Sequence, residues 1–90
     1  MGVPTIMKLV KTTILETTIQ MSIADDGDPE KAIAWLDFEI PLEPLTVASP
    51  GGGPQALGDP GNKPLATIQE AALRYVRDAM NAEIRRLGGH

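Results

Sequence analysis

The stretch "IMKLVKTTILETTIQMSIA", residues 6–24, decides the fold of this chain. It has 19 residues without glycine, proline, asparagine or aspartate, and threonine, isoleucine and valine dominate it. Such β-branched residues pack well on a pleated surface and favour extended backbone. We therefore predict one long β-strand from Ile6 to Ala24, with the more apolar side chains at its odd-numbered positions.

A second strand is predicted after the turn sequence "DDGDPE", residues 25–30. Aspartate and proline are turn formers, and the glycine accepts positive φ, so the chain is expected to reverse here. The segment that follows, residues 32–42, has its large apolar side chains at even positions and Asp37 and Glu39 at odd positions. This alternation indicates a strand with one core face and one polar face. The two segments together predict a long antiparallel β-hairpin over residues 5–42.

Two registers of this hairpin keep both apolar faces on the same side. In the first, Ile19 lies opposite Leu36. The second is shifted by two residues and avoids placing Glu16 opposite Glu39. Directly opposed residues share a face in an antiparallel pair, so both registers satisfy the pattern and the choice between them stays open.

The C-terminal segment, residues 64–87, is predicted to form one amphipathic α-helix, because its apolar residues recur at spacings of three and four. The proline that begins it suits a first helical turn, and "TIQE" at residues 67–70 fits a capping box. Glu70 and Arg74 are spaced to form an ion pair. Gly88 is predicted to end the helix with left-handed backbone. The apolar face consists of Leu65, Ile68, Ala72, Val76, Met80, Ile84 and Leu87.

Residues 43–63 join the predicted hairpin to the predicted helix and are rich in proline and glycine. A phosphate-binding loop would need a Gly-Lys pair, and this chain has none. The composition is typical of a connector that cannot bury apolar surface. Only "LTVA", residues 45–48, has the residue types of a short edge strand.

Size, charge and composition exclude several classes of protein. The 90 residues are expected to form a single domain, residues 1–90, with a thin core. The net charge is −4, and residues 1–44 carry eight acidic residues and three lysines, so we expect no nucleic-acid partner. The chain has no cysteine, which is typical of a cytoplasmic protein. Its apolar runs are far shorter than the roughly 20 residues of a membrane span, so we expect no membrane partner.

We expect no catalytic, cofactor-binding or metal site in this chain, and hence no enzyme. The acidic cluster at residues 25–30 lacks the ligand spacing of a calcium-binding EF-hand loop. His90 is the only histidine and the last residue, where we expect no fold to orient it towards a nucleophile. Asp37 and Glu39 share a strand face, but so small a chain is not expected to build a substrate cleft around them.

The predicted fold class is α+β, with a long antiparallel β-hairpin, a Pro/Gly-rich connector and one C-terminal amphipathic helix, and we expect oligomerisation to complete it. Residues 6–12 extend past the end of the second strand, and unpaired strand edges invite another strand, as in a two-fold dimer. Ile33 and Trp35 stand on the polar sheet face, and tryptophan often anchors interfaces. The expected interface residues are Met7, Leu9, Val10, Ile33 and Trp35.

The predicted function is association without catalysis, as a homo-oligomer or as a subunit of a larger phage or bacterial assembly. The expected partner is a further copy of the chain or another protein. The alternative is an acidic inhibitor or regulator that docks the charged hairpin on a basic protein surface. Salt distinguishes the two, because an acidic docking face weakens at high ionic strength more than an apolar interface does.

Overall fold

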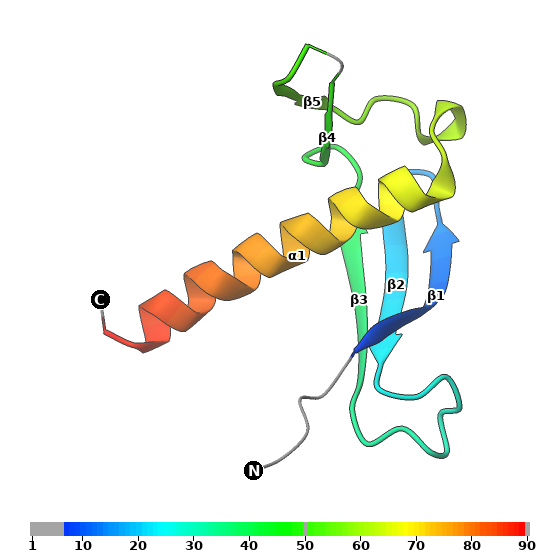
Figure 1. Ribbon diagram of the computed structural model, residues 1–90, viewed down its shortest axis with the longest axis vertical. Coiled ribbons are helices and arrows are strands. Elements are labelled where there is room, and N and C mark those ends of the chain that lie inside the picture. Colours follow the sequence, from blue (N-terminus) through cyan, green and yellow to red (C-terminus); the bar gives the residue numbers. More distant parts are fainter. Residues whose placement is uncertain (1–6, 50, 90) are drawn as a thin grey trace. The chain divides into compact units, whose positions relative to one another are not determined.

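The computed structural model describes residues 7–49 and 51–89 and shows a small α+β fold (Figure 1). A three-stranded antiparallel sheet comes first, a two-stranded sheet follows, and a long C-terminal α-helix completes the order. The chain forms two compact units, residues 1–41 and residues 42–90. The three-stranded sheet belongs to the first unit, and the second unit holds the two-stranded sheet and the helix.

The single long strand predicted at the start of the chain is wrong, because this stretch forms a hairpin of two strands. β1 spans Lys8–Ile14, β2 spans Thr18–Ala24, and the two pair antiparallel. The amide of Leu15 donates a hydrogen bond to the carbonyl oxygen of Thr18 (2.8 Å), which closes a tight turn at residues 16–17. Among the described residues only glycines have positive φ, so this turn forms without the residue types that usually mark a reversal.

The third strand, β3, spans Trp35–Pro41 and pairs antiparallel with β2, which gives the strand order β1-β2-β3. The predicted faces are confirmed, because odd positions of β2 lie opposite even positions of β3. Both predicted registers are wrong, since Ile19 lies opposite Ile40. The difference arises because the connection between the strands, residues 25–34, is longer than the predicted turn.

Aspartates of the loop between β2 and β3 bind the loop's own backbone. Asp25 Oδ1 accepts hydrogen bonds from the amides of Ile33 (3.0 Å) and Ala34 (3.2 Å), and the Asp25 amide donates to the Ala34 carbonyl oxygen (3.2 Å). Asp26 and Asp28 each accept a hydrogen bond from the amide two residues later, at 2.9 and 3.0 Å. Side-chain oxygens that satisfy nearby amides are typical of turns. These carboxylates therefore shape the loop that sets the register of β3.

A β-bulge interrupts β1. Lys8 pairs with Ala24 and Lys11 pairs with Ser22, so three steps along β1 match two steps along β2. In a regular strand, residues three apart lie on opposite faces. The bulge instead brings Lys8 and Lys11 to the same face of the sheet.

The two faces of the three-stranded sheet differ in character. On one face Ile19, Met21 and Ile40 are at most 3% exposed and form the apolar core of the sheet. On the other face, buried Ser22 lies in the central strand between charged side chains of the outer strands. Leu36, near the start of β3, is 46% exposed although it lies on the apolar face.

The Pro/Gly-rich stretch contains short elements of its own. β4 (Thr46–Ala48) and β5 (Pro54–Ala56) pair antiparallel, and one turn of 3-10 helix follows at Pro60–Asn62. The short strand predicted here is confirmed. Leu45 and Leu57 flank the pair, are joined by a backbone hydrogen bond (2.9 Å) and are at most 2% exposed. The stretch thus buries apolar side chains that its composition did not predict, and its role as a connector stays a prediction.

Helix α1 spans Leu65–Leu87, which confirms the predicted C-terminal helix to within one residue. Pro64 occupies the N-cap position, and no side chain caps the first amides. The capping box predicted at residues 67–70 is therefore wrong, because the helix has already begun before the threonine that would start it.

The end of α1 differs from the prediction by one residue. Gly88 keeps helical backbone, with φ −75°, and its amide donates to the carbonyl oxygen of Ile84 (3.0 Å). The left-handed residue is Gly89, with φ +79°. Glycine adopts this conformation without the steric cost that a β-carbon adds, so the predicted terminator is present one position later.

Candidate functional site

The apolar face of α1 is buried at Ile68 and Ala72, whereas Leu65 at its start is 52% exposed and its second half is exposed. Ile68 and Ala72 are at most 1% exposed. Further along the same face, Met80 is 45% exposed, Ile84 66% and Leu87 70%. The spacing of apolar residues is the same in both halves, so the sequence alone does not distinguish the covered half from the uncovered one.

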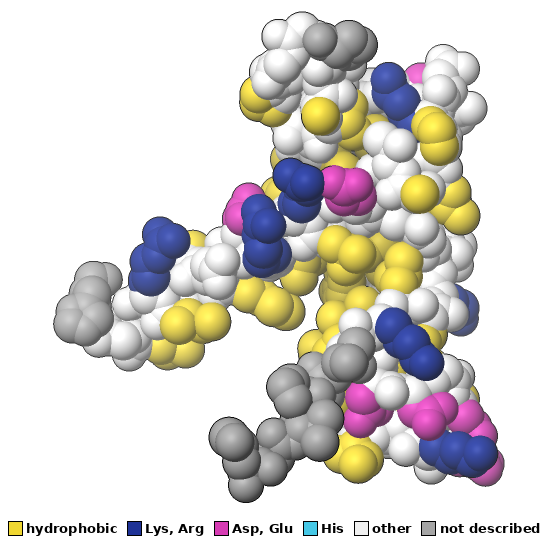
Figure 2. Space-filling view, viewed as in Figure 1, with side chains coloured by type: hydrophobic (Ala, Val, Ile, Leu, Met, Phe, Trp, Pro, Cys, Tyr) yellow, Lys and Arg dark blue, Asp and Glu magenta, His cyan; other side chains and the backbone are white. Residues whose placement is uncertain are grey.

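We call Val76, Met80, Ile84 and Leu87 the helix stripe. Their spacings of four, four and three place them on one side of the helix. Figure 2 shows hydrophobic side chains gathered along this part of α1. Single exposed apolar residues are common on protein surfaces, whereas a contiguous row of large ones is typical of an interaction site.

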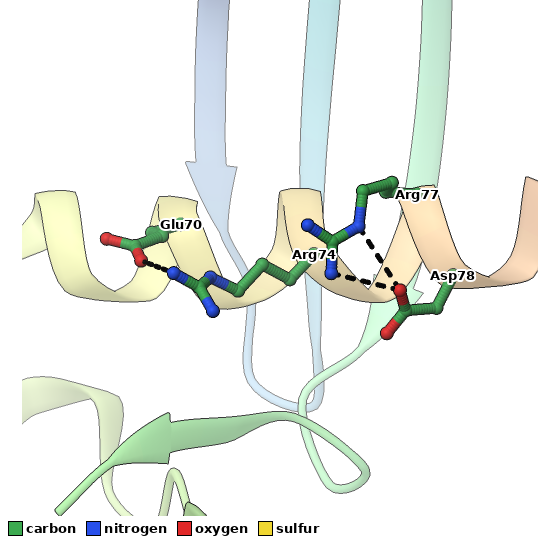
Figure 3. A network of polar contacts seen from close by, with 4 residues as sticks. All are labelled: Glu70, Arg74, Arg77 and Asp78. Atoms are coloured by element: carbon green, nitrogen blue, oxygen red, sulfur yellow. Dashed lines mark hydrogen bonds and ion pairs between the residues drawn. The ribbon is translucent and has the colours of Figure 1, made fainter.

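Two ion pairs lie on the exposed surface of α1 (Figure 3). Arg74 contacts Glu70 at 2.6 Å, which confirms the predicted pair, and Arg77 contacts Asp78 at 3.1 Å. All four side chains are more than 60% exposed. Ion pairs in such positions contribute little to stability. They keep this part of the helix hydrated and leave the helix stripe as its apolar side.

The polar face of the three-stranded sheet is organised in cross-strand rows. One row runs from Lys11 on β1 through Ser22 on β2 to Asp37 on β3. The neighbouring row ends at Glu39 on β3, and Lys8 begins the row on the other side. The basic side chains of this face therefore lie on β1, and its acidic side chains lie on β3.

Asp37 accepts two hydrogen bonds on the same oxygen. The hydroxyl of Ser22 and the indole Nε1 of Trp35 (2.9 Å) both donate to Asp37 Oδ1. These bonds, first from Ser22 and then from Trp35, lower the pKa of Asp37, and the positive charge of Lys11 adds to the effect. Hydrogen bonds to the ionised form stabilise the carboxylate.

Glu39 is held in a similar way by β2. The hydroxyl of Thr18 donates to Glu39 Oε2 (2.7 Å), and the side-chain amide of Gln20 donates to Oε1 (3.3 Å). Both bonds lower the pKa of Glu39, with that from Thr18 having the larger effect. The two carboxylates thus act as ionised hydrogen-bond acceptors that tie β3 to β2.

We expect acid to weaken the three-stranded sheet through these two carboxylates. A carboxyl group whose pKa is lower in the folded than in the unfolded state stabilises the fold above its unfolded pKa, about 4, and this contribution is lost as the pH falls through the folded pKa. The urea midpoint, followed by Trp35 fluorescence, should therefore fall as the pH is lowered from about 5 to 3. In the Asp37→Asn/Glu39→Gln variant this fall should be smaller. An equal fall in both proteins would contradict the assignment.

The structure changes the basis of the interface predicted at the start of the chain. Met7, Leu9 and Val10 are partly buried, and Lys8–Ile14 pairs with β2, so the unpaired segment expected to drive dimerisation is not present. Ile6 lies outside the described residues. The pairing of β1 with β2 was not predicted from the sequence, because the turn between the two strands contains no turn-forming residue. Whether these side chains contact another chain stays a prediction.

Of the two other predicted interface residues, Ile33 lies in the loop before β3 and Trp35 is the first residue of β3. Ile33 is 95% exposed, and Trp35 is 36% exposed with its indole nitrogen bound to Asp37. Trp35 thus takes part in the hydrogen bonding of the polar sheet face, and whether Ile33 and Trp35 contact another chain stays a prediction. The helix stripe was predicted as part of one continuous apolar face, and no sequence signal separated it from the buried residues of α1.

Each unit has a hollow on its described surface. The first, of about 410 Å³, is on the polar sheet face and includes Lys11, Gln20 and Asp37 in its lining. The second, of about 480 Å³, lies between the β4/β5 pair and the first half of α1. The carboxylates lining the first already accept hydrogen bonds from neighbouring side chains. Among the described residues no group of three or more histidine, cysteine or acidic side chains is arranged to hold a metal ion.

Comparisons with protein-family models, with curated proteins and with solved structures give no match for this chain. Within the part of the chain that the structure describes, α1 and the other elements include no helix with the length and apolar character of a membrane span. The exposed surfaces of the chain are therefore the features that bear on its function.

Proposed function

We propose that this chain is a non-catalytic, cytoplasmic protein that acts by associating with further copies of itself, alone or within a larger phage or bacterial assembly. The helix stripe is the observation that carries the proposal. Its last three members are between 45% and 70% exposed, although they continue a face that is buried earlier in the same helix. Burying such side chains at an interface removes apolar surface from water, which is the main favourable term in association.

The small size of the chain supports the same proposal. A protein of 90 residues has a thin core, and oligomerisation is one way in which small folds gain buried apolar surface. The uncovered half of α1 offers several large apolar side chains in one row. A second helix packs on such a row by placing its own side chains between them.

We expect the isolated protein to have a mass above 9.6 kDa in light scattering at micromolar concentration. Ile84→Asp should shift it towards the monomer, because each buried isoleucine contributes about 1.5 to 3 kcal/mol, or roughly a 10- to 100-fold change in the dissociation constant. The helix content, measured by circular dichroism at 222 nm, should not change.

Ala82→Asp is the matched control for this substitution. It introduces the same charge two residues earlier, and 200° of helical rotation places it on the opposite side of α1. Ala82 is exposed, so association should persist in this variant. A wild-type chain that remains monomeric at all concentrations would refute the proposal, and equal effects of the two substitutions would remove the helix stripe from the interface.

The alternative function, an acidic inhibitor or regulator, is supported by the charge of the first unit. Its acidic side chains include the loop aspartates, but these already bind backbone amides within the loop. A docking role predicts capture of a basic protein at low salt and its release at high salt. Self-association through apolar side chains predicts a mass that persists at high salt. Light scattering at both ionic strengths distinguishes the two functions.

A further inference from the structure

The three-stranded sheet has two open edges. β1 and β3 are its outer strands, and among the described residues neither pairs with a strand on its outer side. Each is seven residues long. Unpaired edges of this length offer rows of backbone amides and carbonyl groups to a strand from another chain.

The two edges carry opposite charges on the same face. β1 contains Lys8 and Lys11 and no acidic residue, whereas β3 contains Asp37 and Glu39 and no basic residue. All four side chains are exposed. The bulge in β1 gives the two lysines the spacing of alternate residues, which is also the spacing of the two carboxylates on β3.

This charge distribution distinguishes between the ways in which two edges can meet. A two-fold axis that joins β1 to β1 places lysines beside lysines, and one that joins β3 to β3 places carboxylates beside carboxylates. Like charges on adjacent strands are destabilising, and opposite charges are favourable. The combination with complementary charge is β3 of one copy beside β1 of the next.

The sheet topology fixes the direction of that junction. β1 and β3 both run antiparallel to β2, so they run parallel to each other. When the polar faces of two copies lie on the same side, β1 of the second copy runs parallel to β3 of the first. In this parallel arrangement, one register places Lys8 opposite Asp37 and Lys11 opposite Glu39.

Both carboxylates have the capacity for a further partner. The two hydrogen bonds to Asp37 end on the same oxygen. An ionised carboxylate accepts about four hydrogen bonds, so a lysine from a second copy adds to the present network without replacing it. Backbone hydrogen bonds supply the contact along the edge, and the charges select which edges meet.

We infer that copies of this chain associate head to tail, with the β1 edge of one copy added in parallel to the β3 edge of the next. The inference rests on the proposed function and adds to the helix stripe a second contact surface, with its orientation and symmetry. Such a junction uses two different edges, so it leaves one free edge of each kind and continues into a ring or an open chain of copies. The expected partner is a second copy of this chain.

The test uses charge reversal at one edge and then at both. Lys8→Glu/Lys11→Glu makes both edges acidic, and Asp37→Lys/Glu39→Lys makes both edges basic. We expect wild-type species larger than a dimer in concentration-dependent light scattering, a loss of at least tenfold in association for each double variant, and recovery in the quadruple variant. Circular dichroism confirms that each variant is folded. If charge reversal on β3 prevents folding, Lys8→Gln/Lys11→Gln tests the same junction, because it removes the two positive charges from exposed positions of β1 without reversing them.

The outcomes separate this inference from the proposed function. A wild-type chain that stays monomeric overturns both. If both double variants associate as strongly as the wild-type chain, only the edge junction is overturned. Pairing of like edges about a two-fold axis would give this result, because like charges face each other both before and after reversal. Failure of the quadruple variant to recover, while it remains folded, also overturns the junction.

Discussion

Replacing Ile19 by alanine is expected to lower the free energy of unfolding of the three-stranded sheet by about 2 to 5 kcal/mol. Ile19 is fully buried on the apolar face of the central strand and lies opposite Ile40. The substitution removes the transfer free energy of three carbon atoms and leaves a cavity that a three-stranded sheet closes only in part. Urea unfolding followed by the fluorescence of Trp35, the only tryptophan, measures the loss.

Ile33→Ala is the matched control, because it is the same chemical change in the same unit. Ile33 is 95% exposed, so its truncation should change the free energy of unfolding by about 0.5 kcal/mol or less. Similar losses at the two positions would contradict the burial of Ile19 and the exposure of Ile33. A large loss confined to Ile19 would support the placement of Ile19 in the apolar core of the sheet.

The elements that could be predicted from the sequence are those with a clear period. Alternation along β2 and β3 predicted which side chains share the core face, and the spacing of apolar residues predicted α1 to within one residue. These patterns follow from backbone geometry and hold in any surroundings. They contain no information on how many strands a β-rich stretch forms.

The turn between β1 and β2 was missed because it uses ordinary residues. Leu15, Glu16 and Thr17 include no turn former, and the turn needs no positive φ. Strand length was the available signal, since strands in globular proteins seldom exceed about 10 residues. A continuous strand of 19 residues should have been divided, and the adjacent polar residues Glu16 and Thr17 mark the place.

The register and the bulge depend on contacts that a pattern does not encode. Asp25 binds two amides at the far end of its loop, which lengthens the loop and moves β3 relative to β2. The bulge brings Lys8 to the face of Lys11 although their separation in sequence places them on opposite faces of a regular strand. The candidate edge junction therefore became visible only in the structure.

Replacing Ala72 by aspartate is expected to destabilise the second unit by about 3 to 5 kcal/mol, the cost of an uncompensated buried charge. Ala72 is fully buried on the first half of α1. A carboxylate there either loses its hydration or becomes protonated, and both processes favour the unfolded state. Because α1 is the long helix of the described residues, urea unfolding followed by circular dichroism at 222 nm measures this loss.

Ala79→Asp places the same substitution seven residues later, on nearly the same side of the helix. Ala79 is exposed, so the aspartate stays hydrated and the free energy of unfolding should change by about 0.5 kcal/mol or less. The pair thus tests whether burial along α1 ends between Ala72 and Ala79. If Ala79→Asp were as destabilising as Ala72→Asp in dilute, monomeric protein, the second half of α1 would be covered within one chain. The stripe would then be unavailable to a second copy, and the proposed association would need another surface.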